Sequence, residues 1–504
     1  MNDDFWNELN DGEIHVRDSL QFELKSEFFI NPKLKNNVYK QEIYIFIPNS
    51  LQINPETYSK QQFYLDETNL IRYKTPVMSL SDLVNPDFST SPLTRLQKNI
   101  THSNANHCDV IDSDELKLFG AIFRGTIRER IHQIIKSIKT EESGKVINSI
   151  GCLCSEIAGV CYTFRQLYKN ADPYSTSSEL IRYFKYIDEF ISIVIDEFLV
   201  ILLKEYRTLD HNDKHAEAMI AQCIIKEKLY RKRHHMGPKI SQGHFFANES
   251  ILYRQGLLHR FVLECLTLKH IRVSSAEKHR NILGSIAAGV AMLVYLTLFA
   301  WNASSLVINS FSFIMLAAFF YILKDRIKEG FKTLYSRKAH HWFPDYSTEI
   351  MSFKGFKVGK LKENFAFIDS SELPLGFLKI RNHDFHEELQ ALHRDETIIQ
   401  YKREMRLTAP SHHHGERRRS ITTNFRLNIH HFLQKASNPF QTNLSFDPYT
   451  QEISKKLLPK VYHLNLIIKN SFLKEDLNPK IEIKTYSVIV DKNGIKRVEH
   501  TRKN

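Results

Sequence analysis

Apolar and polar positions alternate along the first part of the chain and then change to a longer period. Residues 19–29 and 39–47 alternate with a period near two, which is typical of half-buried β-strands. From residue 113 to about residue 235, apolar positions recur at the spacing of helices, so we expect a helical bundle. The expected helices cover residues 113–139, 146–168, 177–207, 213–232 and 249–271.

The C-terminal part of the chain returns to a strand pattern. Residues 353–378 and 461–469 predict further short strands. Two alternating runs, 481–490 and 495–501, flank the sequence Asp-Lys-Asn-Gly at 491–494. An Asn-Gly pair at a tight link between alternating runs predicts a β-hairpin.

Three further segments have compositions that predict helix or loop. Residues 385–404 are rich in charged side chains and predict a solvent-exposed helix. Residues 76–106 and 408–423 are polar and rich in turn-forming residues, so we expect loops there.

Two long apolar runs without a charged residue lie near the middle of the chain. Residues 282–301 would span roughly 30 Å as a helix, which matches the hydrocarbon core of a bilayer. Nine Leu, Ile, Val and Phe residues in this run favour insertion by roughly 3 to 5 kcal/mol in total. A four-residue polar link joins it to the second run, residues 306–323. We therefore expect a two-span transmembrane hairpin, the alternative being a buried helical hairpin of a soluble core.

Basic residues flank the two runs, whereas the link between them contains no Lys or Arg. The positive-inside rule then places both termini in the cytoplasm, and we expect a two-pass protein of a bacterial inner membrane. The acidic N-terminus lacks the apolar stretch of a signal peptide, so insertion would depend on the hairpin itself. The flanking basic residues are Arg272, Lys278, Arg280, Lys324, Arg326, Lys328, Lys332, Arg337 and Lys338.

Together these patterns predict an α+β membrane protein made of four parts. The first is an acidic, strand-rich cytosolic domain over residues 1–110, and the second is a helical bundle over 111–275. The transmembrane helical hairpin with its basic flanks covers 276–340. A basic α+β cytosolic domain, 341–504, ends in the β-hairpin.

Length and charge narrow the class of protein. A chain of 504 residues is too long for one core of usual size, and six cysteines exclude a disulfide scaffold. The net charge is +12, but residues 1–112 carry −6 and residues 401–504 carry +11. Since the basic excess lies beside the apolar runs and in the tail, we do not expect a nucleic-acid partner.

Small residues in the first apolar run predict helix packing. Gly284 and Ala288 stand four apart, as do Ser285 and Gly289. This spacing lets two membrane helices approach closely. The partner helix would be the second span or another copy of the chain, which leaves a homo-oligomer open.

Arg417, Arg418 and Arg419 form the sharpest basic run. Near an anionic leaflet each basic residue contributes about 1 kcal/mol, so this run predicts binding to anionic lipid headgroups or to an acidic protein surface. A merely solvated loop is the alternative interpretation.

Histidines invite a search for a metal site. His383, His386 and Glu387 could place two imidazoles and a carboxylate on one helical face, as zinc or iron sites require. The neighbouring Glu, Asp and Arg residues describe a solvated helix equally well, and we favour that interpretation. We therefore expect no cofactor.

No phosphate-binding glycine loop, G-x-S-x-G or H-E-x-x-H sequence occurs in the chain. We accordingly expect a binding or scaffolding component of the membrane, with the lipid bilayer as its first partner, rather than an enzyme. A membrane-tethered, metal-dependent hydrolase is the first alternative. An oligomerising, membrane-perturbing effector is the second.

Overall fold

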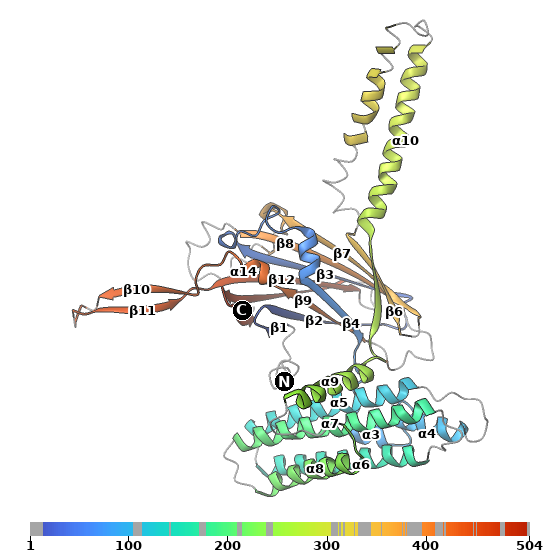
Figure 1. Cartoon of the computed structure of the whole chain (residues 1–504), viewed down its shortest axis with the longest axis vertical. Helices are drawn as coiled ribbons and strands as arrows, with labels where there is room; N and C mark the ends of the chain where they lie inside the picture. Colours follow the sequence, from blue (N-terminus) through green and yellow to red (C-terminus); the bar gives the residue numbers. More distant parts are fainter. Residues whose placement is uncertain are drawn as a thin grey trace. The chain divides into compact units, whose positions relative to one another are not determined.

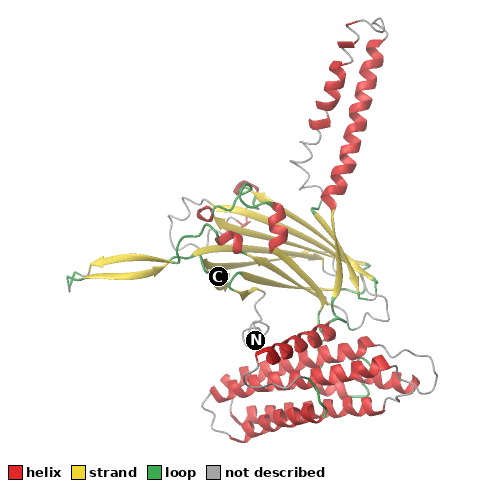
Figure 2. Ribbon diagram, in the orientation of Figure 1, coloured by secondary structure: helices red, strands yellow, loops and turns green. Residues whose placement is uncertain are grey.

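The chain has a mixed α+β architecture, with strand-rich N- and C-terminal regions and a helical middle (Figure 2). A computed structural model divides it into two compact units. The helical unit contains residues 71–268 and 410–422, and the strand unit contains residues 12–70, 269–409 and 423–504. The residues described are 14–103, 113–140, 143–170, 178–208, 214–237, 245–303, 311, 314–315, 318–326, 328–330, 344–353, 355–374, 376–377, 380, 396–408, 417, 420–446, 448–449, 451–473 and 479–500.

The helical unit is built from long helices that bury one face each. Leu180, Phe184 and Ile187 begin the buried stripe of α7, which continues through Leu202 at helical spacing. In this unit α5 packs on α6, α7 and α9, while α8 packs on α6 and α7. Its helices are α3 (Leu80–Val84), α4 (Pro92–Ser103), α5 (Ser113–Thr140), α6 (Ser143–Asn170), α7 (Ser178–Thr208), α8 (Lys214–Arg233) and α9 (Phe245–Leu263).

A half-buried ion-pair network joins three of these helices. The guanidinium of Arg165 in α6 donates from Nε to Asp188 of α7 at 3.0 Å and to both oxygens of Glu227 of α8, at 3.1 and 2.9 Å. The hydroxyl of Tyr230 donates to the other oxygen of Asp188 at 2.7 Å. Bidentate geometry of this kind fixes orientation as well as adding energy, so it sets how the three helices align.

Two sequence expectations differ from the helical unit. The segment expected as a loop over 76–106 contains α3 and α4, and α3 begins with a capping box formed by Ser79 and Asp82. The expected helix over 249–271 ends at Leu263, and β5 (Leu268–Ser274) follows it. The β-branched residues Ile271 and Val273 favour the strand.

The strand unit contains an eight-stranded sheet in the order β14-β13-β12-β3-β8-β7-β6-β5 (Figure 1). A four-stranded sheet has the order β1-β2-β9-β4, and β10 pairs only with β11. The strands are β1 (Ile14–Asp18), β2 (Gln21–Phe29), β3 (Asn36–Pro48), β4 (Glu67–Tyr73), β6 (Tyr346–Ser352), β7 (Lys357–Ile368), β8 (Glu396–Thr408), β9 (Ser420–Asn428), β10 (Phe440–Phe446), β11 (Ile453–Pro459), β12 (Tyr462–Leu473), β13 (Pro479–Asp491) and β14 (Gly494–His500). The short helices are η1 (Asn49–Leu51), α2 (Lys60–Asp66), η2 (Ser370–Glu372) and α14 (His430–Leu433).

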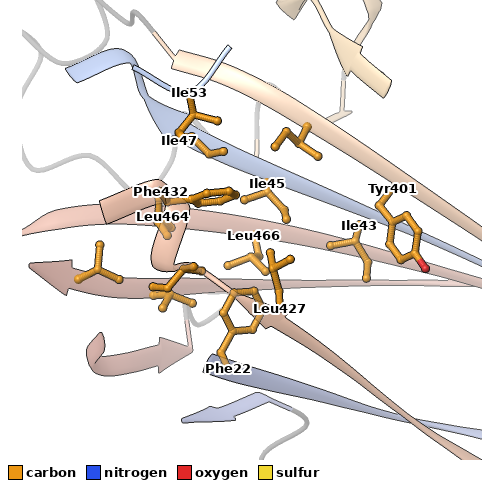
Figure 3. Packing of buried hydrophobic residues seen from close by; sticks show 14 of the residues in the cluster. Phe22, Ile43, Ile45, Ile47, Ile53, Tyr401, Leu427, Phe432, Leu464 and Leu466 are labelled. Atoms are coloured by element: carbon orange, nitrogen blue, oxygen red, sulfur yellow. The ribbon is translucent and has the colours of Figure 1, made fainter. Parts of the chain in front are cut away.

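Strand β3 is central because both of its faces are buried. Ile43, Ile45 and Ile47 belong to the main core, together with Phe22, Leu427, Leu464 and Leu466 from other strands (Figure 3). The alternate residues Tyr44 and Phe46 belong to a second apolar cluster. This explains the unbroken apolar run in β3, which is typical of strands covered on both sides.

The N-terminal and C-terminal strands share one sheet. β3 pairs antiparallel with β8 along its whole length and with β12 on its other side. We expected 1–110 and 341–504 to be separate domains, but residues 12–70 and most of 341–504 contribute to the same compact unit, whereas residues 71–103 belong to the helical unit. Strand alternation within each region does not specify which distant strand completes the sheet.

The C-terminal hairpin prediction is confirmed, and part of an expected helix is wrong. β13 and β14 pair around the turn at 491–494, where Gly494 has φ 133°. Residues 396–404, expected as the second half of a charged helix, lie in β8 because Ile399, Tyr401 and Arg403 alternate on the inward face. Residues 385–395 of that expected helix lie outside the described residues.

Helix α10 (Ser275–Ala303) contains the whole of the first apolar run. The second run is described only in part, and its described residues are helical, as are 324–326 beyond it. By length and composition, a single helix among the described residues could cross a bilayer: residues 144–170 of α6, with mean hydropathy 1.3. Within α10 the stretch Gly284–Thr297 is apolar but shorter. Because Ile150, Leu153 and Phe164 of α6 are fully buried, we assign α6 to the core of the helical unit.

Candidate functional site

Helix α10 exposes several large apolar side chains. Ile286, Leu293 and Trp301 are 58%, 66% and 78% exposed. Ile282, Val290, Met292 and Leu296 of the same helix are also exposed. A monomeric soluble protein seldom leaves a contiguous apolar patch of this kind in water, so the helix needs a cover.

The predicted packing residues Gly284 and Ala288 are half-buried on α10. A Cβ built on Gly284 or Gly289 would meet no described atom within 4 Å. Within the described part of the chain, space is therefore left beside these small residues. Their role in packing against another helix stays a prediction.

Arg417 already has an acidic partner in its own chain. Its Nη1 donates to Oε2 of Glu115 at 2.8 Å, and its Nη2 donates to Oε1 of the same carboxylate. Both side chains are nearly buried, and Glu115 stands in the first turn of α5, where the helix dipole also favours a carboxylate. The guanidinium that we expected at a lipid or partner surface thus pairs with a carboxylate of α5 within the helical unit.

The remaining sequence candidates are not placed. Arg418 and Arg419, and the metal candidates His383, His386 and Glu387, lie outside the described residues. Among the residues whose placement is described, no group of three or more His, Cys, Asp or Glu side chains could hold a metal ion.

A buried pair of carboxylates was missed by the sequence reasoning. Glu67 of β4 and Glu363 of β7 are 5% and 2% exposed, and Asn69 donates hydrogen bonds to both. The hydroxyl of Tyr401 in β8 donates to Oε1 of Glu363 at 2.5 Å and lies 3.3 Å from Oε1 of Glu67. One basic side chain, Arg272, reaches both carboxylates, at 3.3 and 3.4 Å.

These surroundings make the pair a proton-binding group. Burial, together with the negative charge of Glu363, raises the pKa of Glu67 to about 7, although Arg272 and Arg403 act in the opposite direction. Burial and the same two carboxylates keep the pKa of Tyr401 well above its usual value, so its hydroxyl stays a hydrogen-bond donor. With a pKa of about 7, Glu67 is partly protonated near neutral pH.

Arg272 links this cluster to α10 along the chain. Its guanidinium lies 4.8 Å from the ring centre of Tyr64 and 4.3 Å from that of Tyr346, a cation–π arrangement on two aromatic faces. Only Val273 and Ser274 separate Arg272 from the first residue of α10. The sequence reasoning had assigned Arg272 to the basic flank of the apolar run.

The cluster could have been predicted from charged residues at strand positions whose neighbours in the alternation are apolar. Leu361, Glu363 and Phe365 alternate along β7, as do Tyr401, Arg403 and Met405 along β8. A charged residue in the apolar register of a strand must find a partner inside, because an unpaired buried charge is very costly.

Comparisons with known proteins add no constraint on these sites. No protein-family model matches the chain, no characterised protein matches it, and no solved structure matches its fold.

Proposed function

We propose that this chain is a membrane protein anchored by a two-span helical hairpin over residues 282–323, whose soluble regions act as a binding or scaffolding component. Both termini are placed on the cytoplasmic side, in a bacterial inner membrane. The basic residues on both outer flanks and the uncharged link between the runs support this orientation.

The exposed apolar surface of α10 carries the proposal. Each large apolar side chain that moves from water into hydrocarbon contributes roughly 2 kcal/mol. Seven such side chains are exposed on α10, and a bilayer would cover them all at once. Lys324, the first residue after the second run, lies 4.0 Å from the ring centre of Tyr321 near the end of that run, a cation–π pair that suits a membrane–water interface.

The anchoring is tested by a double substitution in α10. Val290→Arg with Leu293→Arg places two charges near the middle of the first run, at a cost of roughly 6 kcal/mol. This exceeds the roughly 3 to 5 kcal/mol that favours insertion of the run. After expression in a bacterial host and a carbonate wash, we expect the parent chain in the membrane pellet and the variant in the supernatant or degraded.

A matched control carries the same charges elsewhere. Ile225→Arg with Leu229→Arg changes two exposed apolar residues of α8 and should leave the chain in the pellet. Release of the parent chain by carbonate would overturn the anchor. Alkaline phosphatase activity from a fusion at either terminus would overturn the orientation.

A further inference from the structure

Among the described residues, none covers the hairpin of β10 and β11, and its two strands pair only with each other (Figure 1). The register runs from Phe440 opposite Pro459 to Phe446 opposite Ile453. Every residue of both strands is exposed except Ser445 and Ser454, which are half-buried. An isolated two-stranded hairpin is marginally stable in water, so this one needs a surface to lie on.

The pairing register gives the hairpin two unlike faces. Side chains opposite each other in an antiparallel pair share a face, and successive residues alternate between faces. One face holds Phe440, Thr442, Leu444, Phe446, Ile453, Lys455, Leu457 and Pro459, six of which are apolar. The other face holds Gln441, Asn443, Ser445, Ser454, Lys456 and Leu458, of which one is apolar.

The position of Lys455 indicates what covers the apolar face. It lies opposite Leu444, inside the apolar register. A packed protein interface would bury its ammonium and require a matching carboxylate there. At a bilayer surface the aliphatic stem lies among acyl chains while the ammonium reaches a phosphate, and an anionic leaflet adds about 1 kcal/mol per lysine.

The size of the apolar face and the composition of the hairpin also favour a bilayer over a protein partner. A stable protein interface usually takes about 20–30 residues from each partner, whereas this face offers eight. Tyr449, at the tip of the hairpin, is 96% exposed, and tyrosine is enriched where membrane meets water.

We propose that the β10–β11 hairpin lies flat on the bilayer and inserts the face of Phe440, Leu444, Phe446, Ile453 and Leu457 into the headgroup boundary. The inference rests on the proposed function, because the α10 anchor is what holds the chain at a membrane. The hairpin is then a second, interfacial attachment of the strand unit, with Lys455 facing anionic headgroups.

Single-cysteine probes test this at alternate positions. The full-length chain, with its native cysteines replaced, is labelled with an environment-sensitive fluorophore at 444, 446 or 457 on the apolar face, or at 443, 445 or 456 on the polar face. Each is reconstituted into phosphatidylcholine–phosphatidylglycerol vesicles containing a spin-labelled lipid. We expect most of the emission to be quenched at the first three positions and little of it at the other three. A probe at 293 in α10 reports the anchor separately.

The outcomes separate the two proposals. Quenching at 293 without quenching at 444, 446 and 457 overturns the hairpin inference and leaves the anchor. Blue-shifted emission at those three positions without lipid quenching also overturns it, because a second copy or another protein then covers the face. Absence of quenching at 293 overturns the anchor and, with it, the inference. If the inference holds, Lys455→Gln weakens quenching at 446 in these vesicles more than in phosphatidylcholine alone.

Discussion

At the scale of single residues, the strand unit contains buried charged side chains. Glu67, Glu363 and Arg403 are nearly inaccessible, and Nη2 of Arg403 has no hydrogen-bond partner among the described residues. Buried groups of this kind tie stability to pH, since their proton affinity differs between the folded and unfolded chain.

We predict that the stability of the strand unit falls as pH rises from about 5 to about 8, and that Glu67→Gln removes much of this fall. The pKa of Glu67 rises from 4.5 in the unfolded chain to about 7, so the folded chain holds this proton more tightly. The contribution is complete below pH 4.5 and is lost by about pH 7, roughly 3 kcal/mol at most. Thermal unfolding of both chains across this pH range, in detergent, measures the difference.

Glu349→Gln is the matched control. A hydrogen bond from Lys357 lowers the pKa of this exposed carboxylate, so it should be ionised throughout the range in both states. Equal pH dependence for the parent chain and Glu67→Gln would contradict the assigned role of Glu67.

The candidate sites themselves could be predicted from sequence only in part. The exposed apolar helix follows from composition, because an uncharged run of twenty residues is visible without a partner. The carboxylate pair does not, because Glu67 and Glu363 meet only after β4 and β7 have been placed in the fold. The partner of Arg417 is hidden in the same way, since Glu115 lies 302 positions away.

At the scale of elements, period and capping predicted the helices α5 to α8 to within a few residues. Their apolar stripes are long and their ends carry polar residues, so local sequence decides the structure. The strand β8 was mistaken for helix because its outward positions are charged, which resembles a solvated helical face. The C-terminal hairpin was predictable because its turn requires glycine at one position.

The turn of the C-terminal hairpin requires a positive φ at Gly494. Its φ of 133° suits glycine alone, and a Cβ there would lie 2.1 Å from the carbonyl oxygen of Ser19. We predict that Gly494→Ala lowers the free energy of unfolding by roughly 2 kcal/mol or more, through backbone strain and loss of the 2.6 Å hydrogen bond from Ile495 N to Ser19 O. Chemical denaturation, followed by circular dichroism of the backbone, measures this loss of unfolding free energy.

Gly159→Ala provides the comparison within a helix. No described atom lies within 4 Å of the added methyl, and alanine has the higher helix propensity. It should stabilise α6 by up to about 1 kcal/mol. If Gly494→Ala left the free energy of unfolding unchanged, this would contradict the close approach of the turn to Ser19, which precedes β2 in the chain.

At the scale of the whole molecule, the strand unit is assembled from distant parts of the chain, whereas 71–268 of the helical unit is continuous. The period-two alternation of a strand does not indicate which other strand it pairs with. The sequence therefore did not predict that these distant segments belong to one unit. The separation of Gln41 from its hydrogen-bond partner Asn470 is 429 residues.

We predict that deleting residues 461–504 unfolds the strand unit and spares the helical unit. The deletion removes β12, the partner of β3, along with Leu464, Leu466 and Val488 of the main core. Limited proteolysis with mass spectrometry should then recover protected peptides from 71–268 and rapid cleavage in 12–70. A chain ending at His500 keeps all described strands and should be protected throughout both regions. Protection of 12–70 in the longer deletion would contradict the pairing.

The place of β3 between β8 and β12 has a consequence for how the protein is made. β3 leaves the ribosome early, but its partner β12 follows some 429 residues later, roughly 20 to 90 seconds at usual translation rates. The nascent Ile43–Ile47 segment lacks both neighbours until β8 is made, and it lacks β12 for longer. The proposed membrane hairpin, residues 282–323, emerges before either neighbour. If the hairpin inserts as proposed, insertion begins before the sheet is complete, and the unpaired apolar strand is then a point at which the nascent chain can aggregate.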